Sequence, residues 1–345
     1  MHNLLRLFVL FTLFGLFTVS KSTAGSSIGG HISWNCVGQD SFIITATYYR
    51  DCNYTPLVNP IVVVSCSTSG DTLATLNLPS PSYVDVTPTC ATSCNRCLPP
   101  YNCTFPYGFS KYTSSKLVVL SNAGSCCSIN LNFNAGQRPT NIITTGAAYQ
   151  NLFMLSTFNR CIGAVNSSPT FESDPVFLTC IGQDQIYQMG AKDTDKDSAG
   201  NLLDSLSYEL IPSLTGPASA FVYSGAYTYN KPIYFWGFPN KNLPKPRGFH
   251  LDNFTGNIYY QPMKIEGTPL AVKIKQWRRI NGVMTTIAEQ NREYTIIVIS
   301  CSTNYVPEIS ANVFEQGCAG DTLQFTITTD DNNTSDSVFL HFDNS

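Results

Sequence analysis

The sequence predicts an all-β protein that is exported and stapled by disulfides. Three observations support this class. Short β-branched and aromatic runs alternate with Gly, Pro, Asn and Asp, and helical periodicity is nearly absent. Thirteen cysteines are present, which favours an oxidising compartment. The 345 residues are enough for two or three domains.

The N-terminus has the pattern of a secretory signal peptide over residues 1–24. Arg6 precedes an apolar run from Leu7 to Val19, and small residues at Ser22–Ala24 offer a cleavage site. This run is too short to span a bilayer, and no later stretch approaches 18 uninterrupted apolar residues. We therefore expect a mature chain without a membrane span of its own.

Strands are expected wherever Val, Ile, Thr and Tyr gather in short runs. Ser41–Arg50, Asn59–Ser67 and Lys116–Leu120 are runs of this kind. In Ser128–Asn134 the apolar residues occupy every second position, which predicts one buried face and one wet face rich in Asn. Each of these segments should therefore pack one side against a core.

A tight hairpin is expected near the end of the second domain. Val272 and Ile274 alternate with lysines, and Asn281-Gly282 supplies the two residues that tolerate positive φ in such a turn. The returning strand is expected over Val283–Ala288. A separate strand is expected over Arg292–Ser300.

The domain boundaries follow from shifts in cysteine content and turn residues. Ten of the thirteen cysteines fall in the first domain, Cys180 and Cys301 bracket the second, and Val306-Pro307 marks a junction. We expect a signal peptide over 1–24, a Cys-rich β-sandwich over 25–168, a second sandwich over 169–302, and the start of a third, truncated domain over 303–345.

Several motifs resemble large Bacteroidetes cell-surface proteins that are often described as gliding-motility-associated. Gly29–Cys36, Thr47–Asn53 and Cys126-Cys127 are similar to the first module of that family, and Asn166–Phe171 is similar to its junction. Leu178–Gln183 and then Ala191–Asp197 follow, as in the family's junction and its Asp-rich turn. Leu251–Ile258 and the closing strand Arg292–Cys301 are similar to its cadherin-like or PKD-like module. The resemblance implies tandem immunoglobulin-like modules at the cell surface. This chain departs from the family by inserting Ser198–Leu203 into the Asp-rich turn.

Four acids form the best candidate metal site. Asp193, Asp195, Asp197 and Asp204 lie close together in sequence, and hard carboxylate oxygens suit Ca²⁺. Lys196 stands where an EF-hand would need glycine, so the turn is not an EF-hand. The alternative is a solvated turn without metal, because Asp and Asn favour turns on their own.

The cysteines are expected to form disulfides, with at least one thiol left over because their number is odd. Cys94 and Cys97 have a spacing that suits zinc, but stapling of an irregular loop is the preferred interpretation. The adjacent Cys126 and Cys127 should take different partners. The full predicted set, with connectivity left open, is Cys36, Cys52, Cys66, Cys90, Cys94, Cys97, Cys103, Cys126, Cys127, Cys161, Cys180 and Cys301.

An aromatic stretch between Phe221 and Asn240 is a candidate binding surface. Tyr229, Tyr234 and Trp236 could stack on sugar rings or contact a protein, although aromatic residues more often fill a core. No catalytic residue is assigned, because the histidines are isolated and no metalloprotease, nucleophile-elbow or phosphate-loop motif occurs.

The small fraction of charged residues narrows the range of possible functions. Only 12% of residues are charged, against roughly a quarter in an average domain, and the formal net charge is -3. A nucleic-acid binder would need a basic stripe, so we expect no nucleic-acid partner. The chain is interpreted as a non-catalytic structural or adhesion protein on the extracellular side of a bacterial outer membrane, with other surface proteins or extracellular glycans as partners. The alternatives are a carbohydrate-binding module or the non-catalytic part of a surface hydrolase.

Overall fold

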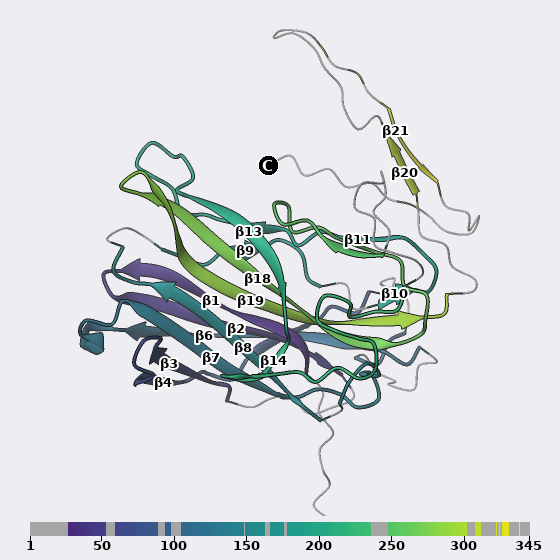
Figure 1. Ribbon diagram of the computed structural model, residues 1–345, viewed down its shortest axis with the longest axis horizontal. Helices are drawn as coiled ribbons and strands as arrows, with labels where there is room; N and C mark the ends of the chain where they lie inside the picture. The colour runs from purple at the N-terminus through teal and green to yellow at the C-terminus, as the bar shows by residue number, and fades with distance from the viewer. Residues whose placement is uncertain are drawn as a thin grey trace, which may run out of the picture.

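The computed structural model in Figure 1 confirms the all-β class. Its described residues contain strands and one 3-10 turn at Ser121–Ala123. No helix in this part of the chain has the length and apolarity to cross a membrane. The described residues are 27–52, 59–88, 94–97, 105–147, 149–162, 166–175, 178–235, 248–301, 308–311 and 326–330, with 322, 324 and 338.

Fourteen strands form one curled sheet, which is almost entirely antiparallel. The main path runs in the order β4-β3-β7-β8-β19-β1-β2-β6-β5. The strands on this path are β1 (Ser27–Gly38), β2 (Ser41–Asp51), β3 (Ile61–Cys66), β4 (Thr72–Asn77), β5 (Ser82–Asp85), β6 (Phe109–Val119), β7 (Ser128–Gln137), β8 (Asn151–Asn159) and β19 (Val283–Ile299). The strands that branch from it are β10 (Leu178–Cys180), β13 (Asp204–Ile211), β14 (Leu214–Gly216), β15 (Ser219–Ala220) and β18 (Gly267–Ile280).

Three small sheets complete the described part. One has the order β11-β17-β16, and the others are the pairs β9 with β12 and β20 with β21. Their bounds are β9 (Thr170–Phe171), β11 (Gln185–Tyr187), β12 (Ala191–Lys192), β16 (Phe249–Leu251), β17 (Ile258–Tyr260), β20 (Glu308–Ala311) and β21 (Ile327–Asp330). Most of the expected third domain, 303–345, lies outside the described residues, as does the expected signal peptide over 1–24.

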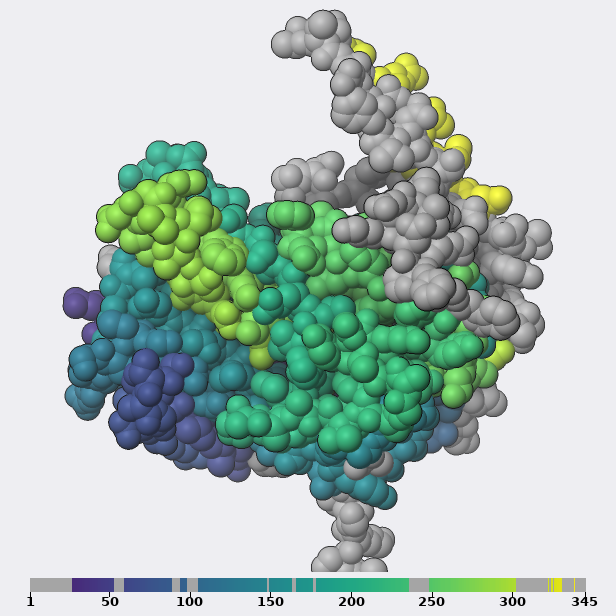
Figure 2. Space-filling model, viewed as in Figure 1, coloured from purple at the N-terminus to yellow at the C-terminus, as the bar shows by residue number. Residues whose placement is uncertain are grey.

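The long strand β19 corrects the expectation of separate domains over 25–168 and 169–302. One edge of β19 pairs with β18 throughout, and the other edge meets three strands in turn. Residues 288–290 pair with β8, residues 292–294 with β1, and residues 297–299 in parallel with β10. The two segments therefore share one sheet, and their described residues form one continuous body in Figure 2.

Each segment nevertheless supplies most of one hydrophobic core. The first core lies between β1-β2-β6 and β3-β7-β8, where Trp34 stacks on Phe158 with ring centroids 5.0 Å apart. The second core packs β13, β18 and β19 against the β11-β17-β16 sheet, with residues from β1, β2 and β6 added. The predicted alternation along β7 is confirmed, because Ile129, Leu131 and Phe133 are fully buried in the first core.

The hairpin between β18 and β19 confirms the Asn281-Gly282 prediction. Both residues have positive φ, at 50° and 84°, and Ile280 pairs with Val283 across the turn. The expected separation of Val283–Ala288 from Arg292–Ser300 is wrong, because one 17-residue strand covers both. The intervening polar residues continue the strand, and their side chains find partners inside the fold.

Four disulfides have both cysteines among the described residues, and they fasten strand ends. They join Cys66 to Cys126 before β7, and Cys127 to Cys161 after β8. The adjacent cysteines therefore take different partners, as predicted. The other two bonds are Cys52–Cys97 and Cys180–Cys301.

Candidate cation site

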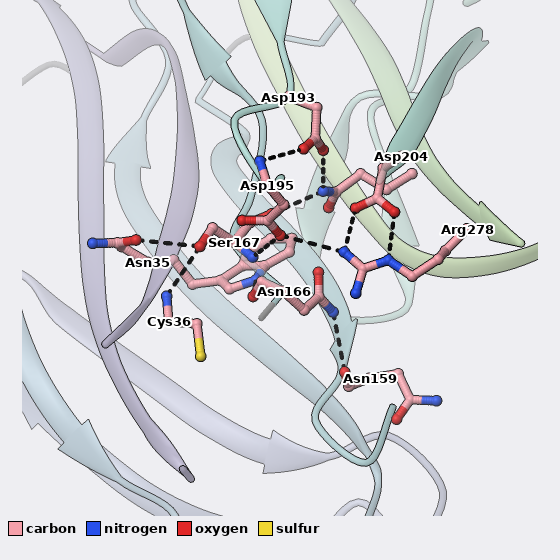
Figure 3. Close-up of polar contacts among 11 residues, drawn as sticks. Asn35, Cys36, Asn159, Asn166, Ser167, Asp193, Asp195, Asp204 and Arg278 are labelled. Carbon is pink, nitrogen blue, oxygen red and sulfur yellow. Dashed lines mark hydrogen bonds and ion pairs between the residues drawn. The ribbon is translucent and has the colours of Figure 1, made fainter. Parts of the chain in front are cut away.

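Three acids from the predicted turn gather at the place where the chain passes from the first core to the second. Asp193 and Asp195 follow β12, and Asp204 opens β13. One carboxylate oxygen from each lies within 4.8 Å of the other two, and all three residues are buried. We call Asp193, Asp195 and Asp204 the acidic cluster (Figure 3).

Backbone amides and a buried glutamine orient the first two carboxylates. Asp193 accepts hydrogen bonds from the Asp195 amide at 2.8 Å and from Gln276 Nε2 at 2.6 Å. Asp195 accepts a bond from the Ser167 amide at 2.7 Å. Segment 166–168 is itself held to β1, because Ser168 Oγ accepts a bond from the Trp34 amide. The acidic cluster thus connects β1, the turn and β18.

An arginine on β18 faces the third carboxylate. Arg278 donates from Nε and Nη2 to the two oxygens of Asp204, at 2.6 and 2.7 Å, and Nη2 lies 3.5 Å from Asp195 Oδ2. The register of β13 against β18 places Asp204 directly opposite Arg278, so sheet pairing fixes this bidentate contact.

Burial makes the acidic cluster electrostatically costly. Desolvation raises the pKa of Asp193 and of Asp195, and neighbouring carboxylates act in the same direction. The same carboxylates help to raise the pKa of Arg278 against its own desolvation. Three negative charges therefore face one positive charge in a partly dehydrated setting.

Asp197, the fourth predicted ligand, lies outside the acidic cluster. Its carboxylate is exposed and accepts bonds from the backbone amides of Ala199 and Asn201, both at 2.9 Å. These bonds lower its pKa, with the Asn201 side chain contributing most. The inserted residues close a small turn around Asp197, so the solvated-turn alternative describes this residue and not the other three.

The aromatic candidates are only partly described. Tyr229 and Tyr234 are 38% and 45% exposed, whereas Trp236 lies outside the described residues. Buried Glu266 organises this stretch, because its carboxylate accepts bonds from the Tyr227 hydroxyl and the Tyr234 amide. One buried carboxylate thus holds the Tyr227 side chain and the Tyr234 backbone.

The cysteine predictions divide into three groups. Cys94 and Cys97 are both disulfide-bonded, and the bond from Cys97 to Cys52 supports stapling over zinc or redox chemistry. Cys90 and Cys103 lie outside the described residues. Placing Cys36 among the disulfides is wrong. It is a free, partly exposed thiol near the end of β1, where its Sγ lies 3.6 Å from the Gly38 carbonyl oxygen.

Sequence reasoning did not identify a groove on the outer face of β3 and β7. We call it the asparagine groove, because Asn130, Asn132 and Asn134 line it together with Ser65 and Phe153. Its volume is about 770 Å³, and none of the described residues that line it is charged. The predicted wet Asn face of β7 was the available signal, but the concavity depends on β3 and on the loop before β15.

Comparison with known proteins adds no relative. No family model matched the chain, and no curated protein or solved structure matched it.

Proposed function

We propose that the chain is a non-catalytic structural or adhesive protein of the bacterial cell surface, of the Bacteroidetes gliding-motility-associated type that its motifs resemble. The observation that carries the proposal is the covalent and hydrogen-bonded continuity of the fold. Strand β19 ties both cores into one sheet, and four disulfides between described residues fasten strand ends in both segments. Such bonds are typical of secreted or extracellular proteins.

A sheet that runs through both cores suits a protein that bears mechanical load. Unfolding either core requires separation of β19 from β8 or β1, so the two cores resist force together. The low charge density leaves a surface of hydroxyl and amide groups, which suits contact with neutral polymers or other surface proteins.

Surface display is tested by antibody labelling of intact bacterial cells that encode the chain, with permeabilised cells as the reference. We expect labelling without permeabilisation and its loss after external protease treatment. A strain without the gene should attach less well or glide less well, and the intact gene should restore the wild-type behaviour. Labelling restricted to permeabilised cells would contradict the proposal, as would hydrolysis of polysaccharide by the purified chain.

The asparagine groove favours carbohydrate binding as a second candidate function. Its amides and hydroxyls can exchange hydrogen bonds with sugar hydroxyls, and the uncharged lining suits a neutral glycan. Asn132 is held in place, because its Nδ2 donates to the Val63 carbonyl and to Ser65 Oγ.

A glycan array with two variants distinguishes the two candidate sugar sites. Binding through the asparagine groove should favour neutral over acidic glycans. It should be lost in Asn132→Asp, which keeps the size of the side chain but replaces the amide donor to the Val63 carbonyl by a carboxylate that this carbonyl repels. Tyr234→Ala should leave that binding intact. Loss of binding in Tyr234→Ala alone would assign the sugar to the aromatic stretch, and absence of binding to any glycan would remove this second function.

A further inference from the structure

We propose that the acidic cluster binds one Ca²⁺ ion, with the side-chain oxygens of Gln276 and Asn166 completing the protein ligands. This inference concerns the chain's own stability and does not depend on the proposed surface function. It rests on two buried oxygens that have no hydrogen-bond partner, in addition to the three carboxylates.

The first of these oxygens belongs to Gln276 on β18. This residue is 1% exposed, and its Nε2 donates to Asp193 Oδ2 at 2.6 Å and to the Ser167 carbonyl at 2.8 Å. The amide group therefore lies against the acidic cluster. Its Oε1 is buried and has no partner among the described residues.

The second oxygen belongs to Asn166, which is 2% exposed. Its Nδ2 donates to the Asn159 carbonyl at 3.0 Å, and its Oδ1 has no partner among the described residues. Figure 3 shows Oδ1 on the side of Arg278 and the acidic cluster, opposite the nitrogen that bonds Asn159. The neighbouring backbone is fixed, because the Asn166 carbonyl accepts a bond from Trp34 Nε1 at 2.9 Å.

Neither amide can remove its unpaired oxygen by rotating. Each nitrogen bonds to oxygen acceptors, so a flipped amide would direct its oxygen at those acceptors and lose the bonds. A buried acceptor left without a donor is unfavourable. The Gln276 amide lies against the Asp193 carboxylate, which is itself an acceptor and supplies no donor to Oε1. A cation would satisfy such an oxygen.

Charge and ligand type point to calcium. Three carboxylates and the Arg278 guanidinium leave a formal charge of -2, which one divalent cation neutralises. The protein offers five oxygen-bearing groups and no nitrogen or sulfur ligand among them. Ca²⁺ takes six to eight oxygens in flexible geometry, whereas Mg²⁺ demands a strict octahedron with several waters and Zn²⁺ prefers nitrogen and sulfur.

The ion would fasten three separate parts of the fold. Asn166 lies at the exit from the first core, Asp193 and Asp195 lie in the turn after β12, and Gln276 lies on β18. Because unfolding separates these segments and destroys the site, binding must stabilise the folded chain.

The test is titration of the full chain, freed of metal by chelation, with CaCl2 in a calorimeter and in thermal unfolding. Titration should extend to about 5 mM, because extracellular calcium modules bind at roughly 10⁻⁴–10⁻³ M. We expect one bound ion and a rise of several degrees in the melting temperature, with little response to MgCl2. Absence of both a binding heat and a melting shift would overturn the proposal. An equal response to MgCl2 would overturn the assignment to calcium.

Two aspartates give a matched pair of variants. Asp195→Asn should weaken Ca²⁺ binding by roughly tenfold or more, whereas Asp197→Asn should leave it unchanged, since Asp197 lies in its own exposed turn. The reverse pattern would refute the site.

If Asp195→Asn fails to fold, Tb³⁺ provides a test on the wild-type chain. Trp34, which bonds Asn166, should sensitise Tb³⁺ luminescence that CaCl2 then displaces. Absence of a displaceable signal would count against the site.

Discussion

The ion pair between Arg138 and Glu293 allows a sharp test of how the two cores are joined. Both side chains are almost fully buried, at 1% and 4% exposure. Arg138 Nε lies 3.0 Å from Glu293 Oε1, and Nη2 bonds the same oxygen. The guanidinium also donates to the carbonyls of Asn151 and Leu214. One side chain therefore connects the end of β7 with β8, β14 and β19.

Substitution of either partner should lower the free energy of unfolding, and the two losses should depend differently on pH. Breaking a buried pair from one side typically costs about 3–5 kcal/mol of unfolding free energy, because the other charge stays buried. In Glu293→Gln the arginine cannot lose its charge, so the penalty should be nearly independent of pH. In Arg138→Met the remaining carboxyl can take up a proton, so the penalty should shrink in acid.

The direction of the pH dependence in Arg138→Met follows from the pKa of Glu293. Burial already raises this pKa above 4.5, and loss of Arg138 removes the interaction that opposes the rise. For a carboxyl whose folded pKa is raised, the favourable contribution is complete below the unfolded pKa and is lost as pH rises through the folded value. Arg138→Met should therefore approach wild-type stability as pH falls from 8 toward about 5.

The assay is urea denaturation with disulfides intact, followed by tryptophan fluorescence, for both variants and the double variant Arg138→Met/Glu293→Leu. The double variant should cost less than the sum of the single ones, because it leaves no buried charge. Single-variant costs below about 1 kcal/mol, or a penalty in Arg138→Met that grows in acid, would refute the reasoning.

Three further predictions concern β1 and the disulfides. A Cβ at Gly29 would lie 2.5 Å from the Glu293 carbonyl oxygen, whereas one at Gly38 meets nothing closer than 3.8 Å. In urea denaturation, Gly29→Ala should therefore lower the free energy of unfolding by at least about 2 kcal/mol, and Gly38→Ala should leave it almost unchanged. Burial first, and then Arg292 and Lys111, lower the pKa of His31 well below 6.5, so stability should fall as pH drops below about 6.5. In His31→Phe the free energy of unfolding should depend less steeply on pH in this acid range. An unchanged slope would show that another group causes the loss of stability. Mass spectrometry of unreduced peptides should find Cys66–Cys126 and Cys127–Cys161 with a free Cys36, and a linked Cys36 would contradict the structure.

Local pattern predicted individual strands well, because a sheet face and a turn are encoded by neighbouring residues. The alternation in β7 and the Asn281-Gly282 turn are of this kind. The joining of β1 to β19 could not be predicted, since His31 and Arg292 lie far apart in sequence and nothing local specifies their pairing. The polar residues between Ala288 and Tyr294 look like a break between strands, whereas they form the centre of one.

The acidic cluster was predicted only in part for a similar reason. Its three carboxylates are close in sequence, but the two side chains on β18 that orient them, Gln276 and Arg278, are about 70 or more residues away from each carboxylate. Their role depends on the register between β13 and β18. Asp197 looked equivalent to the others because sequence spacing does not show which way a turn directs a carboxylate.

The polar centre of β19 explains how two apolar cores meet in one arrangement. Gln290 Nε2 donates to the Ile32 carbonyl on β1 at 2.9 Å, and Glu293 binds Arg138. Arg292 donates to the carbonyls of Ser173 and Met189 and stacks its guanidinium 4.0 Å from the centre of the Phe171 ring. Apolar surfaces can slide against one another at small cost, but buried polar groups are stable only when paired. A shift of β19 by one residue would turn these side chains to the opposite face and leave them unpaired, so the polar segment adds to the apolar cores in fixing the register.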